Sequence, residues 1–198
     1  MIVVGLTGSI GMGKSTVLKM FADLGARTWS ADEAVHRLYA LGGAAVSAIG
    51  AAIPGCISDG AVDRARLSKI LLGEPALLAR VEAIVHPLVA EDRARFLEAA
   101  RAARAGLAVL DIPLLFEKGY ERGFDAVIVV SAAAHIQKKR VLARRGMSAE
   151  KFAAILAKQM PDSEKRQRAD YVISTDRSLA ATRSDVEQAI ADLGRRFP

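Results

Sequence analysis

The stretch from Gly8 to Ser15 has the residue types and spacing of a phosphate-binding loop. It reads GSIGMGKS and fits the pattern of a glycine, four residues, Gly-Lys and then Ser or Thr. The glycines let backbone N–H groups approach phosphate oxygens, Lys14 would reach the β- and γ-phosphates, and the Ser15 hydroxyl would bind Mg²⁺. The residues expected to contact a nucleoside triphosphate are Gly8, Gly11, Met12, Gly13, Lys14, Ser15 and Thr16.

The segments on either side of this loop support the same interpretation. Residues 1–6 form a short apolar run with β-branched residues, which is typical of a buried strand. Residues 16–25 have helical apolar spacing and end at Gly25. The alternative is a glycine-rich turn that happens to precede a lysine, and the strand–loop–helix context argues against it.

Four further strand-like runs alternate with helical segments along the chain. They cover residues 27–30, 107–112, 126–131 and 171–174. This alternation predicts an α/β fold of the P-loop kinase type, in which helices flank a five-stranded parallel sheet. Such folds bind ligands at the carboxyl ends of their strands, so functional residues should follow these runs.

Two segments depart from the alternation. Residues 32–104 have an almost wholly helical pattern, with a turn at 58–60 and a break near 73–75, which predicts an inserted helical subdomain. Residues 135–168 are dense in Lys, Arg and Gln, and they occupy the place of a mobile lid. The remaining segments, 1–31, 105–134 and 169–198, would form the nucleotide-binding core.

Two aspartates follow predicted strands. Asp111 ends the apolar run LAVLD. In P-loop enzymes, a carboxylate at the end of such a strand helps to hold Mg²⁺. The alternative is an aspartate that caps a helix or stabilises a turn. Asp32 follows the second strand, where a carboxylate could accept the proton of an attacking hydroxyl. Asp32 could equally be the N-cap of a helix over residues 33–39, and one residue could serve both roles.

Basic and imidazole side chains are the other candidates for chemistry. Arg140 and Arg144 lie four apart on a helix predicted over residues 133–145, so they would share a face and could stabilise a transferring phosphoryl group. The alternative is a solvated basic face. His86 precedes Pro87 inside a helical pattern over 77–104, which predicts a kink or a helix junction there. His86 is then either a structural residue or a ligand contact.

The overall charge suits a polyanionic ligand. The chain has 28 Lys and Arg against 22 Asp and Glu, a net charge of +6. Aromatic residues do not alternate with the basic ones, so we expect no nucleic-acid partner. The single cysteine, Cys56, excludes an internal disulfide. No signal-peptide or membrane-spanning pattern is present, and we expect a cytoplasmic monomer or small homo-oligomer.

Taken together, these motifs resemble the dephospho-CoA kinase family over essentially the whole chain. The matching segments are GLTGSIGMGKST at 5–16, SAD at 30–32, DGAVDRARL at 59–67, EAIVHPLV at 82–89, LDIPLLFE at 110–117, QKKR at 137–140 and KRQRADYVIST at 165–175. IPLLFE and IVHP, in their order between the P-loop and the last strand, are far more specific than the P-loop alone.

The resemblance implies ATP-dependent phosphorylation of the ribose 3′-hydroxyl of dephospho-CoA in the presence of Mg²⁺. Asp32 would be the base on that hydroxyl, while Lys14 and Arg140 would neutralise the transferring phosphoryl group. Arg144 would contact ATP, and Ser15 and Asp111 would hold the metal. The acceptor would be bound by Asp32, Arg64, His86, Leu114 and Phe116, with residues 32–104 as the CoA-binding subdomain.

One departure from the family pattern concerns the end of the last strand. Many members have asparagine there, whereas this chain has Ser174, Thr175 and Asp176 and contains no asparagine at all. Thr175 or a backbone group would have to replace that asparagine near the adenine. The lack of asparagine also excludes the guanine-reading N-K-x-D motif of a GTPase-like switch. Another small-metabolite P-loop kinase remains the alternative function.

Overall fold

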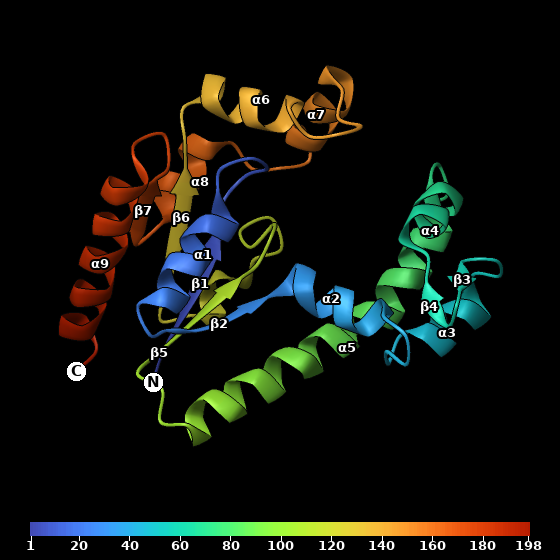
Figure 1. The fold of residues 1–198 in the computed structure, drawn as a ribbon, viewed down its shortest axis with the longest axis horizontal. Helices are drawn as coiled ribbons and strands as arrows, with labels where there is room; N and C mark the ends of the chain where they lie inside the picture. The colour runs from blue at the N-terminus through green and yellow to red at the C-terminus, as the bar shows by residue number, and fades with distance from the viewer. The chain divides into compact units, whose positions relative to one another are not determined.

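The computed structural model describes all 198 residues and divides into two compact units (Figure 1). The core unit comprises Met1–Thr28 and Ala100–Pro198, and the helical unit comprises Trp29–Ala99. The chain passes from one unit to the other inside the strand β2 (Arg27–Ser30) and returns inside the helix α5 (Pro75–Ala102).

A five-stranded sheet organises the fold. Its order is β2-β5-β1-β6-β7, and its other members are β1 (Ile2–Thr7), β5 (Leu107–Asp111), β6 (Ala126–Ser131) and β7 (Tyr171–Ser174). Strand β1 pairs in parallel with β5 and β6, and β6 pairs in parallel with β7. The predicted five strands and the P-loop kinase architecture are therefore confirmed.

Helices and loops cover the two faces of this sheet within the core unit. On one face, alternate residues of β1 pack with α1 (Lys14–Asp23) and α9 (Leu179–Arg196). On the other face, Gly5 lies beneath Leu115, because a Cβ at Gly5 would be 2.7 Å from that side chain. The unit is completed by η1 (Tyr120–Gly123), α6 (Ala134–Leu142), α7 (Ala149–Leu156) and α8 (Asp162–Arg168).

The helical unit has an apolar core of its own. Its elements are α2 (Ala31–Tyr39), α3 (Val46–Ala52), a small antiparallel hairpin of β3 (Ile57–Ser58) and β4 (Ala61–Val62), α4 (Arg64–Leu71) and most of α5 (Pro75–Ala102). Ile49, Ile53 and Cys56 are among the residues buried at its centre. Cys56 is a free thiol.

Three local expectations differ from the structure. Helix α5 continues through Pro87, so the predicted helix junction there is wrong. Val85 is buried in the apolar cluster of this unit, and Leu88 packs against that cluster. This packing offsets the backbone hydrogen bond that proline removes. The predicted turn at 58–60 carries the two-residue strands β3 and β4, which are too short to give an alternating pattern. The helix predicted over 133–145 ends at Leu142.

None of the helices combines the length and the apolar content that crossing a bilayer requires.

Candidate active site

The P-loop connects β1 to α1, and its glycines occupy positions that no side chain could share. Gly8 has φ 153°, and a Cβ there would lie 2.4 Å from the carbonyl oxygen of Val130. Gly11 has φ 77°, and a Cβ there would lie 2.4 Å from Cγ2 of Val141. The loop therefore passes directly against β6 and α6, and only glycine permits this approach.

Lys14 opens α1 and lies back over the loop. Its Nζ donates a hydrogen bond to the carbonyl oxygen of Gly8 at 2.8 Å. Ser15 and Thr16 follow it in the exposed first turn, which contains no acidic residue. The positive end of the helix dipole and the Lys14 ammonium thus lie at one place, as an anion site requires.

Asp111 lies at the carboxyl end of β5, in register with Leu6 of β1. Its side chain is buried, with an exposed fraction of 7%. The chain holds no group of three or more His, Cys, Asp or Glu side chains that could bind a metal ion. Asp111 and the Ser15 hydroxyl nevertheless suit Mg²⁺, because this ion usually takes one or two protein oxygens and completes its shell with phosphates and water.

Two glutamines within residues 135–168 hold the P-loop, and neither was predicted to be a site residue. Gln137 Nε2 donates to the carbonyl oxygen of Ile10 at 2.8 Å, and the N–H of Ile10 donates to Gln159 Oε1 at 3.1 Å. Gln137 is buried despite its polar side chain. In the sequence, Gln137 is one polar residue in the hydrophilic segment QKKR, and nothing local distinguishes it from its exposed neighbours Lys138 and Lys139.

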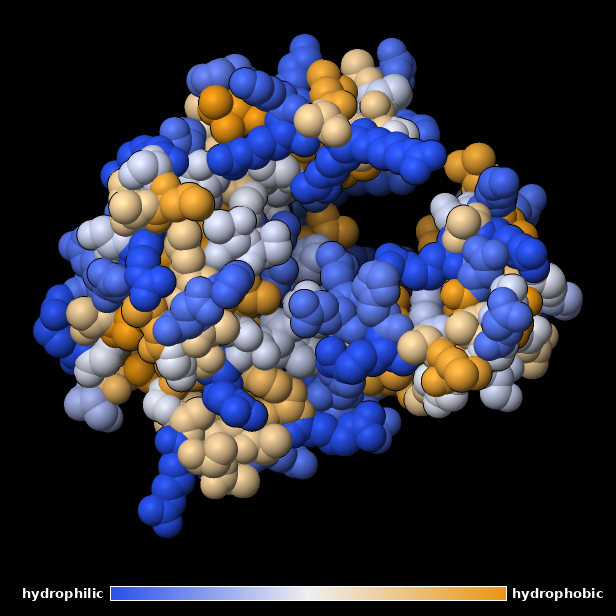
Figure 2. Space-filling model, viewed as in Figure 1, coloured by the Kyte–Doolittle hydropathy of each residue, from blue (hydrophilic) through white to orange (hydrophobic).

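The two arginines expected to share a helix face do not. Arg140 lies on α6, half-buried, and donates to Oγ1 of Thr175 at 2.9 Å and to its carbonyl oxygen at 2.6 Å. Arg144 lies in an exposed turn beyond the end of α6, shortly before Gly146 with φ 76°. Long hydrophilic side chains lie over α6 and α7 near the top of the view (Figure 2).

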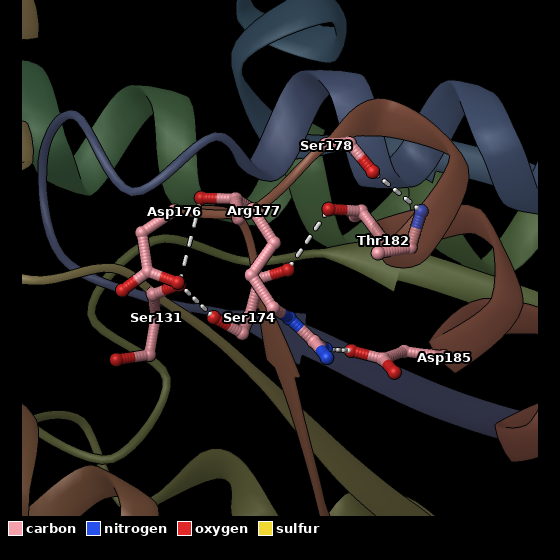
Figure 3. Close-up of polar contacts among 9 residues, drawn as sticks. Ser131, Ser174, Asp176, Arg177, Ser178, Thr182 and Asp185 are labelled. Carbon is pink, nitrogen blue, oxygen red and sulfur yellow. Dashed lines mark hydrogen bonds and ion pairs between the residues drawn. The ribbon is translucent and has the colours of Figure 1, made fainter.

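The loop after β7 is held by a polar network (Figure 3). Asp176 accepts hydrogen bonds from the Ser174 hydroxyl and, at 3.0 Å, from the N–H of Ala133 just before α6. The bond from Ser174, and then the bond from Ala133, keep the pKa of Asp176 below its usual value. Arg177 pairs with Asp185 of α9. The network ties the loop to both α6 and α9.

The segment after β5 contains Leu114 and Phe116, which were both expected at the acceptor. Leu114 has φ 56°, a left-handed conformation that is uncommon for leucine and often accompanies function. Phe116 is buried, and the guanidinium of Arg168 lies 4.8 Å from its ring centroid. The next residue, Glu117, pairs with the fully buried Lys165 at 2.8 Å. The segment is therefore anchored to α8.

The other three predicted site residues belong to the helical unit, and all three are exposed: Asp32, Arg64 and His86. Asp32 lies in the first turn of α2, but the N-cap of that helix is Ser30, whose Oγ accepts from the N–H of Glu33 at 3.4 Å. The N-cap interpretation of Asp32 is therefore wrong. Arg64 hydrogen-bonds the ring of His36.

The sequence is similar to proteins of one family over nearly its full length. The family model for dephospho-CoA kinase matches residues 2–181. A dephospho-CoA kinase from Mesorhizobium japonicum is 55% identical over 193 residues, covering 98% of this chain and 97% of that protein. Another, from Rhodopseudomonas palustris, is 48% identical over 198 residues, covering 100% and 98%.

Solved structures share the fold. A crystal structure from Thermus thermophilus superposes with a TM-score of 0.80 at 33% identity, covering 100% of this chain and 98% of that one. Shikimate kinase from Acinetobacter baumannii has a TM-score of 0.53 at 15% identity, covering 100% and 96%, and shows the fold alone. With the P-loop geometry and the full-length match, the conclusion is that this chain belongs to the dephospho-CoA kinase family.

Proposed function

We propose that the chain transfers the γ-phosphoryl group of ATP to the ribose 3′-hydroxyl of dephospho-CoA, giving CoA and ADP. The observation that carries the proposal is an intact P-loop, with Lys14 held against Gly8, in a member of this kinase family. The P-loop suits this reaction, because the transferring phosphoryl group is negatively charged and its charge must be neutralised.

The phosphate end of the reaction is assigned to the core unit. Lys14 binds the β- and γ-phosphates together with the N–H groups of the loop and of the first turn of α1. Arg140 stabilises negative charge on the transferring group, and Arg144 contacts ATP. When bound, Mg²⁺ neutralises charge on the phosphates, and Ser15 and Asp111 are the residues that would hold it.

The acceptor end is assigned to Asp32. Its carboxylate accepts the proton of the 3′-hydroxyl as that oxygen forms a bond to the γ-phosphorus. The bond from the γ-phosphorus to the bridging oxygen breaks, and ADP leaves with the bonding electron pair. Asp32 then releases its proton to water. The exposure of Asp32 supports this role, since the acceptor must reach it.

The rest of the acceptor is assigned to a basic and an apolar group of residues. Arg64 and His86 bind its phosphates, and Leu114 lines its apolar path. Phe116 was expected to line this path as well, but its ring is buried, so its role is limited to supporting its neighbours. Residues 32–104 form the CoA-binding subdomain and 135–168 the lid. We also propose that the protein is a cytoplasmic monomer or small homo-oligomer. Light scattering of the purified chain measures its oligomeric state.

A coupled assay of ADP release tests the function. Purified protein with Mg-ATP is offered dephospho-CoA, AMP, adenosine, shikimate or gluconate, and the product is identified by mass. Turnover confined to dephospho-CoA, with CoA as product, is the expected result. Turnover on another acceptor would keep the P-loop chemistry and overturn the acceptor. ATP binding without turnover on any acceptor would indicate a regulatory nucleotide-binding protein instead.

A further inference from the structure

We infer that Thr175 is a positioning residue, whose hydroxyl couples the phosphate-binding arginine Arg140 to the backbone of the P-loop. The inference rests on the proposed function, because it concerns how that site is held in its working geometry. It also gives a role to the residue found where many family members have asparagine.

The geometry of the hydroxyl carries the inference. Thr175 Oγ1 donates to the carbonyl oxygen of Met12 at 2.7 Å and accepts from Nη1 of Arg140 at 2.9 Å. The carbonyl oxygen of Ser131 is a second acceptor for this hydroxyl, but at 3.5 Å it is much farther away than that of Met12, so the single proton of the hydroxyl points toward the P-loop. The second amine of Arg140 is bound to the carbonyl oxygen of the same threonine at 2.6 Å. One residue thus orients the arginine through two hydrogen bonds.

Thr175 also packs against the P-loop through its carbon atoms. A Cβ at Gly13 would lie 3.2 Å from Oγ1 and 3.3 Å from Cγ2 of Thr175. Gly13 directly precedes Lys14 and has φ 92°, so the threonine supports the loop at the point where the helix begins. A shift of Thr175 would therefore move both the arginine and the turn that carries Lys14.

The backbone around Thr175 is itself fixed. Its N–H donates to the carbonyl oxygen of Ser131 at 2.9 Å, continuing the pairing of β7 with β6. The next residue, Asp176, is bound to Ser174 (Figure 3). It also accepts a hydrogen bond from the N–H of Ala133. Because Thr175 is buried and its hydroxyl is engaged on both sides, its side chain offers no donor to an adenine ring. Its role is to position other groups.

Kinetics of four single variants of the full chain, and of one double variant, test this role. Thr175→Val keeps the shape and removes the hydroxyl, Thr175→Ser keeps the hydroxyl, and Arg140→Ala removes the partner. Thr182→Val is the matched control: this buried threonine donates to the carbonyl oxygen of Ser174 at 2.9 Å in the same corner but contacts neither Arg140 nor the P-loop. Should Thr175→Val fail to fold, Thr175→Ala replaces it.

The expected result is a loss in kcat of about 10–100-fold for Thr175→Val, the effect of a misplaced catalytic group. The KM for ATP should stay close to its original value, Thr175→Ser should restore kcat, and Thr182→Val should leave it unchanged. Adding Thr175→Val to Arg140→Ala should cost little further activity, because valine keeps the packing against Gly13 and the lost hydroxyl acts through Arg140.

Three results would overturn the inference: an unchanged kcat in Thr175→Val, a raised KM for ATP with kcat intact, or additive losses in the double variant. A readout without the acceptor separates this inference from the proposed function. Thr175→Val should weaken the binding of ADP with aluminium fluoride, an analogue of the transferring group, while the affinity for ADP alone is kept. Equal weakening of both would count against a role in positioning, whatever the acceptor is.

Discussion

The two units hold their functional residues in different ways. In the core unit, the P-loop is tied to its surroundings by Gln137, Gln159 and Thr175, and Lys14 is bound to Gly8 within the loop. In the helical unit, Asp32, Arg64 and His86 stand on exposed helix surfaces around a core of apolar side chains. The residues proposed to bind phosphate are held by hydrogen bonds within the core unit, whereas the residues of the helical unit that are proposed to bind the acceptor face solvent.

This difference agrees with the proposed roles. Groups that stabilise charge in a transition state work best when they are already oriented, since no reorganisation is then needed during the reaction. Groups that bind the acceptor must first admit it, so exposure serves them. The comparison predicts that changes in the core unit affect stability together with chemistry, and that changes at the exposed residues affect activity alone.

The largest effect should come from an exposed residue of the helical unit. Asp32→Asn removes the proposed base and should lower kcat by about 10²–10⁴-fold, the usual contribution of general base catalysis. The KM for ATP and the thermal midpoint should change little, because the side chain is exposed. Glu33→Gln, the neighbouring exposed acid in the same turn, is the control in a steady-state assay. Near-normal turnover in Asp32→Asn would leave the residue without a catalytic role.

The next effect concerns the stability of the core unit. Lys165 is fully buried against the partly buried Glu117, so Lys165→Met removes the only cation paired with that carboxylate, which keeps its bond from the N–H of Met160, and should cost about 3 kcal/mol in the free energy of unfolding. The paired change Glu117→Gln with Lys165→Met should recover much of this loss. Urea titration measures both.

The control for that experiment is an exposed ion pair in the same unit. Lys19→Ala breaks the pair with Asp23 and should cost no more than about 1 kcal/mol. If Lys165→Met and Lys19→Ala proved equally mild, the idea that the core unit is held by buried polar contacts would be contradicted.

A smaller effect should separate two arginines of α4. Arg64→Ala should raise the KM for dephospho-CoA by roughly 10–100-fold, as expected when a hydrogen bond to a charged group is lost. The KM for ATP should not change. Arg66→Ala is the matched control, because Arg66 lies on the same helix and pairs with Asp63, the N-cap of that helix. Equal effects of the two variants would indicate a general loss of positive charge instead of a specific contact.

The smallest expected effect is a loss of stability of the folded protein as the pH falls. Burial alone would raise the pKa of Glu117, but hydrogen bonds from Lys165 and Met160 hold it below the ordinary value of 4.5. In the helical unit, burial alone would raise the pKa of Asp92, but hydrogen bonds from Trp29 and Arg37 hold it below the ordinary value of 3.8.

Both carboxylates are therefore more acidic in the folded chain, and their stabilising contribution is complete above the unfolded pKa and lost as the pH falls through the folded value. Urea titrations from pH 7 to pH 3 should show this loss, and Glu117→Gln should reduce its slope below about pH 4.5. An unchanged slope would contradict the assignment.

Much of the core unit could be predicted from the sequence, because its signals are local. The residues of β2, β6 and β7 are the predicted ones, since short apolar runs between turns are read directly from the chain. The helical unit was less accessible: β3 and β4 are too short to show a period, and Pro87 is tolerated inside α5 because of packing that the sequence does not display.

The candidate site divides in the same way. A P-loop is a continuous motif whose glycines and lysine are recognisable one after another, so its residues were predictable. The support of the loop by Gln137, Gln159 and Thr175 was not, because these residues lie more than a hundred positions away. The end of α6 at Leu142, which separates Arg144 from Arg140, was also missed.

The sequence by itself therefore determined the succession of strands and helices along the chain, the phosphate-binding loop, the family resemblance and the residues that could carry charge. Only the tertiary structure decided which of those residues are buried or exposed, that Ser30 and not Asp32 caps α2, and that Arg140 reaches the P-loop through Thr175. The physical reason is that helices, strands and tight turns follow from neighbouring residues, whereas burial and hydrogen bonds between distant segments exist only once the sheet has brought those segments together.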